Sequence, residues 1–189
     1  YATVKPDNYK IGQMLAKRLI QDDEEQLENK KIGVILGKAE TEENVNRIAG
    51  LKDGLEGSGC EISWEYNYAR GNQNTSEIIA SKKQVDYLVI LDNWALEEVG
   101  EAAEGNKYHG AKIYGVGSSE KTIVLLDNQN IECLVVPDDY ETGYMSMNEI
   151  AKKLRHSFYK MNSCETEVRI INKEDLYSKD LERFLYSYE

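Results

Sequence analysis

Apolar residues along this chain alternate between two spacings, one typical of helices and one typical of buried strands. Over 9–20, apolar residues recur three or four positions apart, which predicts a helix with one apolar face, and Asp7 stands where its N-cap is expected. By contrast, the strand predicted over 85–91 contains a short continuous apolar run from Tyr87 to Leu91, which is typical of a strand buried on both faces. The same patterns predict further strands over 30–37, 60–66, 111–117, 131–136 and 167–171, and further helices over 43–56, 76–83, 94–104, 119–128, 140–159 and 173–185.

Strands that alternate with helices are typical of βαβ units, whose crossovers are right-handed and place helices on both faces of a parallel sheet. We therefore predict a doubly wound three-layer α/β/α sandwich with a mainly parallel sheet of five or six strands. In such folds ligands bind in the crevice beyond the carboxyl ends of the strands. The loops expected at that edge are 37–44, 67–74, 92–94, 117–119 and 137–139.

The charge balance narrows the range of functions. The 189 residues carry 23 Lys and Arg against 34 Asp and Glu, a formal net charge of −11. This acid excess argues against binding of nucleic acid, which requires clustered basic residues. No apolar run approaches the ~20 residues of a membrane span, so we expect none in this chain. Because Tyr1 is not an initiator Met, we expect the chain to be a processed or excised piece of a longer protein.

Residues that carry metal or cofactor chemistry are sparse. Cys60, Cys133 and Cys164 are an odd number without close spacing, and His109 and His156 stand far from them, so we expect no metal site. The cysteines are expected to be free thiols, with one disulfide left open if the protein is extracellular. The loops at the carboxyl edge carry neither a dinucleotide nor a Walker fingerprint nor a nucleophile elbow, so we expect no cofactor, no catalytic residue and no enzyme activity.

Polar and aromatic residues at the same edge are suited to binding without chemistry. Arg47 lies one turn into the helix after the first strand, where it either reaches the crevice or pairs with Glu43 four residues earlier. Asp92, Asn93 and Trp94 follow the best-defined strand directly. Asp92 is also suited to capping the next helix, and Trp94 to packing under a loop. Together they supply acceptors, an amide and an aromatic face, as a carbohydrate site does.

Two further pairs at this edge allow both a structural and a binding role. Ser118 and Ser119 are favoured as helix caps, with donation to a ligand as the alternative. Asp138 and Asp139 precede a helix that begins at Tyr140, so they are first of all partners of its N-terminus.

The order of several segments resembles the type I periplasmic-binding-protein family, the sugar-binding proteins of ABC importers, which share their fold with the effector domains of LacI-type repressors. The segments are DNYKIG, KIGVILG, NRIAGLKDGL, VDYLVILDNWAL, KIYGVGSS and CLVVPDDYETGY. The family has two similar lobes joined by three crossings, with the ligand clamped between them. The resemblance implies that 1–137 is the second lobe, that 138–166 crosses to a missing first lobe, and that 167–189 is the return strand and C-terminal segment.

The resemblance also assigns candidate ligand contacts. It places one on Arg47, in a segment of the form R-x-x-G-L, and one on Asp92. Three other polar positions of the family pattern are replaced, by Leu91, Gly117 and Pro137. Two alternatives follow: the ligand differs from ribose or galactose, with other side chains taking over the contacts, or the protein senses a partner. The side chains expected to take over are Trp94 and Asp138 or Asp139, and Asn93 and Ser118 complete the set of candidate ligand-binding residues.

The function implied is that of a solute-binding component that captures a small polar ligand, expected to be a carbohydrate, and presents it to an ABC permease or a sensor kinase. The tail INKEDLYSKDLERFLYSYE is similar to the ends of sugar-binding lipoproteins, which implies a lipid-anchored protein on the extracellular face of the membrane or a periplasmic one. The alternative is a cytoplasmic effector-binding domain of a LacI-type regulator.

Overall fold

The computed structural model describes residues 1–23, 27–38, 41–71, 74–103 and 106–185, the side chains of 182 and 183 excepted. Its main sheet consists of β2 (Lys31–Leu36), β3 (Glu61–Asn67), β4 (Tyr87–Ile90), β5 (Lys112–Val116), β6 (Cys133–Pro137) and β8 (Val168–Ile171). The strand order is β3-β2-β4-β5-β6-β8. All neighbouring pairs are parallel except β6 and β8, which are antiparallel.

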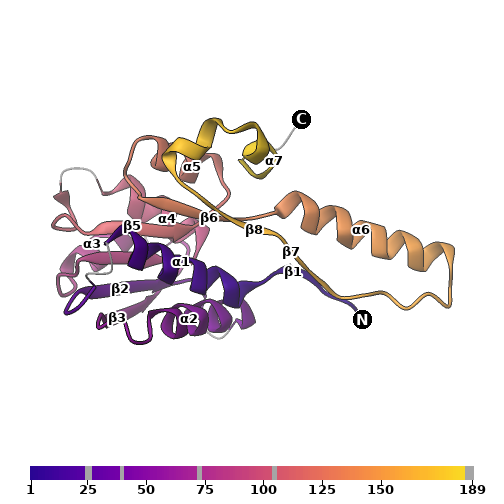
Figure 1. Ribbon diagram of the computed structural model, residues 1–189, viewed down its shortest axis with the longest axis horizontal. Coiled ribbons are helices and arrows are strands. Elements are labelled where there is room, and N and C mark those ends of the chain that lie inside the picture. The colour runs from indigo at the N-terminus through magenta and orange to yellow at the C-terminus, as the bar shows by residue number, and fades with distance from the viewer. Residues whose placement is uncertain (24–26, 39–40, 72–73, 104–105, 186–189) are drawn as a thin grey trace.

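Helices cover both faces of this sheet, which confirms the predicted doubly wound α/β/α sandwich (Figure 1). The helices are α1 (Asn8–Asp22), α2 (Glu42–Leu55), α3 (Thr75–Ser81), α4 (Asn93–Glu101), α5 (Glu120–Asp127), α6 (Asp139–Arg155) and α7 (Glu182–Leu185). Alternate residues of each strand face opposite sides. In β4, Leu88 and Ile90 pack in one apolar cluster with α3, α4, α5 and α7, whereas Val89 packs in a second with α1 and α2.

Helices α1 and α2 approach one another so closely that only glycine fits at their contact. A Cβ added to Gly12 would lie 2.1 Å from the carbonyl oxygen of Arg47, and one added to Gly50 would lie 2.0 Å from that of Tyr9. Both distances are far below van der Waals contact, and a packed interior does not yield by that much. The two glycines therefore hold the α2 segment around Arg47 against the start of α1.

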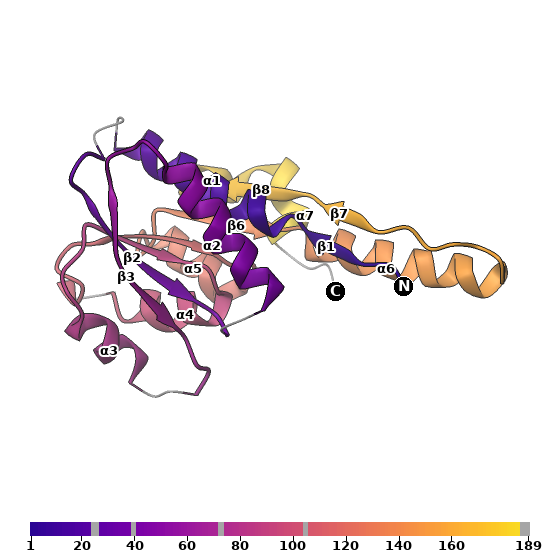
Figure 2. The same cartoon turned by 90° about the horizontal axis from the view of Figure 1, so that it is seen from below.

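A second region, here called the arm, projects from the rest of the molecule, here called the body (Figures 1 and 2). The arm consists of α6, residues 156–163 and a separate two-stranded parallel sheet of β1 (Val4–Pro6) and β7 (Cys164–Thr166). The carboxylate of Glu149 in α6 accepts hydrogen bonds from Tyr159 Oη and from the backbone amide of Asn162, which holds the returning chain against the helix. The other side of α6 and the turn that follows it expose large apolar side chains: Tyr140, Tyr144, Met147, Ile150, Leu154 and Phe158.

The structure corrects two predicted helix boundaries. The helix expected over 140–159 ends at Arg155, because Lys153 Nζ donates to the carbonyl oxygens of Ser157 and Tyr159 and turns the chain back. The helix expected over 173–185 is divided into two 3-10 helices, Lys173–Tyr177 and Lys179–Leu181, followed by α7. Strands β1 and β7 were not predicted, because three residues without an apolar pattern give no signal until the two segments meet.

Candidate functional site

Arg47 lies at the carboxyl edge of the sheet, where a buried guanidinium joins three structural elements. The residue is 6% exposed. Nε donates to Asn8 Oδ1 at 2.9 Å, and Nη1 donates to the carbonyl oxygen of Leu91 at 2.7 Å. Nη2 pairs with Glu43 Oε1 at 2.5 Å. The pair with Glu43 is therefore present, but the guanidinium is buried rather than at the surface, and contact between Arg47 and a ligand stays a prediction.

The electrostatic surroundings of Arg47 bring two other predicted site residues into its neighbourhood. Burial lowers the pKa of the Arg47 guanidinium, and the negative charges of Glu43, Asp92 and Asp139 oppose that shift. An arginine remains protonated at neutral pH in either case. Arg47, Asp92 and Asp139 thus belong to one charged cluster, contributed by α2, the loop after β4 and the start of α6.

The carboxylate of Asp92 has one structural and one outward role. It is the N-cap of α4, with Oδ1 accepting from the backbone amide of Ala95 at 2.9 Å, as the capping interpretation predicted. Its other oxygen lies beside the loop that follows β2, where a Cβ added to Gly37 would come within 2.7 Å of Asp92 Oδ2. Glycine at position 37 therefore keeps the space around this oxygen open at the centre of the edge.

Asn93 ties two of the edge loops together. Its Oδ1 accepts hydrogen bonds from the backbone amides of Ser118 at 3.0 Å and Ser119 at 3.3 Å, and its Nδ2 donates to Glu97 Oε1 at 2.9 Å. A Cβ added to Gly117 would lie 2.9 Å from Asn93 Oδ1, so this tie needs the glycine. The amide of Asn93 is engaged within the protein and fixes the loop after β5 against α4.

The remaining predicted polar residues divide between caps and an exposed pair. Ser119 caps α5 by accepting from the backbone amide of Thr122, and Asp138, 1% exposed, caps α6 by accepting from that of Glu141 at 2.7 Å. Ser118 Oγ, in contrast, donates to Asp139 Oδ2 at 2.7 Å. The Ser118–Asp139 pair lies at the surface, where the loop after β5 meets the beginning of the arm.

Trp94 stands exposed at the same edge and has a partner that the sequence did not reveal. Trp94 is 46% exposed, and the guanidinium carbon of Arg70 lies 4.0 Å from the centroid of the indole ring of Trp94. Arg70 comes from the loop that follows β3, within the segment 67–74 that the topology places at this edge. That position was the available signal, but nothing in the sequence shows that an arginine in a loop meets an aromatic ring 24 residues later.

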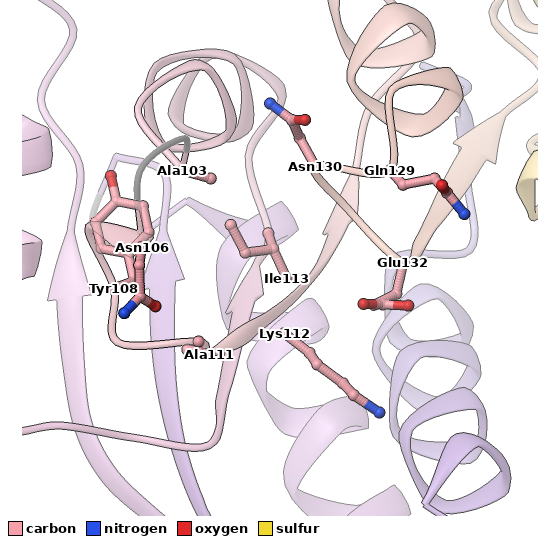
Figure 3. A pocket seen from close by; sticks show the side chains of 10 residues that line it. Ala103, Asn106, Tyr108, Ala111, Lys112, Ile113, Gln129, Asn130 and Glu132 are labelled. Atoms are coloured by element: carbon pink, nitrogen blue, oxygen red, sulfur yellow. The ribbon is translucent and has the colours of Figure 1, made fainter.

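A cavity of about 240 Å³ lies at the opposite, amino-terminal edge of the sheet (Figure 3). Its walls come from the loop before β5, the start of β5 and the turn after α5. The lining residues are Ala103, Asn106, Tyr108, Gly110, Ala111, Lys112, Ile113, Gln129, Asn130 and Glu132. None of the predicted site residues lies there, and the rule for doubly wound sheets places ligands at the other edge. We therefore locate the candidate site at the carboxyl edge.

No group of three or more His, Cys, Asp or Glu side chains in the described segments is arranged to hold a metal ion. Within the same segments no helix combines the length and the apolar character that crossing a bilayer requires.

A family profile decides the relationship of the chain to known proteins. The profile described as periplasmic binding protein domain matches residues 1–157. The chain belongs to this family. Membership in the periplasmic-binding-protein family confirms the relationship that the ordered motifs predicted. No curated protein sequence matches the chain closely enough to add to this.

Solved structures of periplasmic binding proteins share the fold at low sequence identity. A carbohydrate transporter solute-binding protein from Agrobacterium radiobacter, in complex with D-arabinose, is 19% identical and has a TM-score of 0.83, with 98% of this chain and 65% of that one covered. GanP, a glucose-galactose binding protein from Geobacillus stearothermophilus, is 21% identical with a TM-score of 0.79, covering 93% and 64%. The XylFII-LytSN complex matches at 17% identity and a TM-score of 0.77, covering 90% and 61%.

The coverage of these matches is asymmetric. Nearly all of this chain is aligned, yet it spans only 65% and 64% of the length of the first two solved structures. At such identities the likeness concerns the fold, and the shared part contains the body and the arm.

Proposed function

We propose that this chain is the ligand-binding lobe of a solute-binding protein that captures a small polar ligand, a sugar or sugar derivative, without catalysing a reaction. One observation carries the proposal: at the carboxyl edge the buried Arg47 donates to the carbonyl oxygen of Leu91, directly before Asp92, and the Ser118–Asp139 pair lies at the same edge, where the arm begins. Family membership supports it, as do the sugars that the structural relatives bind, D-arabinose in one and glucose or galactose in the other. These relatives are transport proteins, which favours this function over that of a LacI-type effector domain.

The domain arrangement belongs to the same proposal. We assign 1–137 to the second lobe, 138–166 to a crossing into the first lobe and back, and 167–189 to the return strand and C-terminal segment. The exposed apolar residues on α6 and in the turn that follows it support this division, because Met147, Leu154 and Phe158 are 66%, 81% and 100% exposed in this chain. Surfaces of this kind are normally covered by another part of the structure. The ligand would lie between the two lobes, and closure around it would be the signal that a partner reads.

The partner we propose is an ABC permease or a membrane sensor, on the outer side of the cytoplasmic membrane, with the protein held there by a lipid anchor or free in the periplasm. The structure of XylFII with LytSN supports a protein partner for a protein of this fold. Mass spectrometry of the mature N-terminus from a native host tests the anchor, because a diacylglyceryl cysteine is expected there. A mature protein without that modification, recovered from the soluble extracellular or periplasmic fraction, would favour the unanchored form.

A binding experiment tests the ligand-capture proposal. The complete protein, meaning this chain together with its first lobe, is titrated calorimetrically with a panel of pentoses, hexoses and their derivatives. We expect at least one to bind, and Arg47→Lys to weaken that binding by about tenfold or more, because an ammonium replaces the forked guanidinium. Arg18→Lys is the matched control, since Arg18 also pairs four residues along its helix, with Asp22, but not at this edge. Absence of binding across the panel would contradict the proposal.

A further inference from the structure

Arg70 stacks on Trp94 at the rim of the candidate site, and this contact preorganises its guanidinium for binding. The two side chains come from different loops, after β3 and before α4, and Arg70 Cζ lies 4.0 Å from the centroid of the indole. A guanidinium over an aromatic face is held by cation–π attraction, while the N–H donors at its edge remain available. The contact fixes the position of Arg70 without using its donors.

Arg70 carries a positive charge at this edge that is not paired with a carboxylate in the described part of the chain. Arg47 is paired with Glu43, and the described residues place neither a carboxylate nor another acceptor on Arg70. The nearby carboxylates have other partners. Asp92 caps α4, and Asp139 accepts from Ser118 at the start of α6, where helix dipoles favour negative charge. The overall charge of −11 opposes an anion only weakly, because charges beyond about 8 Å are screened at physiological salt.

The same edge offers few groups to a neutral sugar. Leu91, Gly117 and Pro137 supply no polar side chain where three strands end. Asn93 is engaged by the loop after β5, and Asp138 is buried as a cap. Few side chains of this lobe are therefore free to form hydrogen bonds with sugar hydroxyl groups. The guanidinium of Arg70, in contrast, presents two parallel N–H donors, the geometry that matches a carboxylate.

We infer that Arg70, held on Trp94, is a specificity-determining residue and that the ligand is an acidic sugar, such as a uronate or an aldonate, whose carboxylate the Arg70 fork binds. The inference rests on the proposed function, because it names the class of sugar taken by the same site. It also gives Trp94 a role different from direct stacking on a sugar ring, since one face of the indole is covered by Arg70.

Matched ligands separate this inference from the function on which it rests. The complete protein is titrated with galactose and galacturonate, with glucose and glucuronate, and with glucose 6-phosphate. We expect a uronate to bind at least tenfold more tightly than its neutral partner. Arg70→Gln should reduce uronate affinity by about 10- to 100-fold, the range for a hydrogen bond between two charged groups, and leave neutral-sugar affinity unchanged.

Two more variants test the geometry. Arg70→Lys keeps the charge but not the fork, so it should restore only part of the preference for the uronate. Trp94→Leu removes the stack and should weaken uronate binding by roughly two- to fivefold. Lys82→Gln is the matched control. The Nζ atom of Lys82 lies 5.3 Å from the ring centroid of Trp64, and Trp64 lies in the middle of β3, away from the carboxyl edge. This substitution should change neither the uronate affinity nor the neutral-sugar affinity.

Three results would overturn the inference. Neutral sugars that bind as tightly as the uronates, with no effect of Arg70→Gln, would leave the sugar-binding proposal standing and refute the acidic ligand. If glucose 6-phosphate binds and the uronates do not, a carboxylate is not the group that Arg70 recognises. If no sugar of either kind binds, the proposed function itself fails.

Discussion

The body and the arm are built from the same kind of amphipathic helix, yet only the body buries the apolar faces. Leu15 in α1 and Leu51 in α2 are completely buried against the sheet, whereas Leu154 in α6 is 81% exposed. In the arm the polar side of the helix is the organised one, because Glu149 receives hydrogen bonds from Tyr159 and from the returning backbone. The difference shows that the body folds around its own core, whereas the arm leaves the apolar face of α6 exposed in the described structure.

The largest expected effect concerns apolar truncation in the two regions. Leu51→Ala should lower the free energy of unfolding of this chain by about 3 kcal/mol, because it leaves a cavity in a fully packed interior. Leu154→Ala should change it by less than about 0.5 kcal/mol, since the side chain contacts solvent. Urea unfolding followed by circular dichroism measures both. Equal losses would break the distinction between body and arm. In the complete protein, Leu154→Ala should become costly if the first lobe covers α6.

Glycine positions in the two regions should respond in opposite directions. Gly12→Ala should destabilise by about 1–3 kcal/mol, because its Cβ would overlap the backbone of α2. Gly143→Ala in α6 meets no atom within 4 Å and should stabilise the chain by about 0.5–1 kcal/mol through helix propensity. Thermal unfolding of both variants and the parent measures this. A neutral Gly12→Ala would show that α1 and α2 can separate without loss.

Loss of a side-chain hydrogen bond in the body should lower the free energy of unfolding more than loss of one in the arm. Asn93→Ala leaves the backbone amides of Ser118 and Ser119 without their acceptor and should cost about 1–2 kcal/mol. Ser146→Ala removes only a bond from Ser146 Oγ to the carbonyl oxygen of Thr142 within α6, which a helix tolerates with little change. Hydrogen exchange of residues 117–119 reports the loosening directly. Unchanged protection there would mean that Asn93 does not fix the loop.

The smallest expected effect is a pH dependence confined to the arm. Hydrogen bonds from Lys152 and from the Asn162 backbone lower the pKa of Glu149. A lowered pKa stabilises the folded arm fully above the ordinary glutamate value, about 4.3, and the stabilisation is lost as pH falls through the lowered value. Exchange of the Asn162 amide should therefore accelerate, beyond its intrinsic rate, below about pH 4. Glu149→Gln should abolish that dependence, and an unchanged profile in this variant would exclude Glu149 as its source.

Prediction from the sequence succeeded where local pattern and long-range packing agree. Apolar runs, and alternation over 60–66, located every strand of the main sheet, and residues such as Asp7 and Asp92 cap the helices that follow them, as expected. It failed for β1 and β7, which exist only through their mutual pairing. It also failed for the terminal helix, where Asp175 accepts from the backbone of Asn172 and closes a short 3-10 turn.

For the candidate site, the sequence located the edge but not the use made of each side chain. Arg47 could be placed at the crevice from topology alone, yet its burial depends on the Gly12 and Gly50 contact between helices. Asn93 and Asp138 were candidates for ligand contact, and the structure shows both engaged within the protein. Arg70 was not a candidate, because its contact with Trp94 joins two loops across the edge.

The pairing of β6 with β8 makes the arm removable by design. Pro137 and Val168 are directly opposite one another in this antiparallel pair, and the Asp138 amide donates to the carbonyl oxygen of Glu167 at 2.9 Å. The chain therefore leaves and re-enters the body at adjacent points. A two-residue Asn-Gly turn in place of residues 139–166 would convert that exit and return into a β-hairpin. If the chain also begins at Asp7, β1 is removed together with its partner β7, and the result would be a minimal recombinant body, open to crystallography without the exposed helix. Ligand binding would still be measured on the complete protein, because Asp139 of the candidate site is lost with the arm.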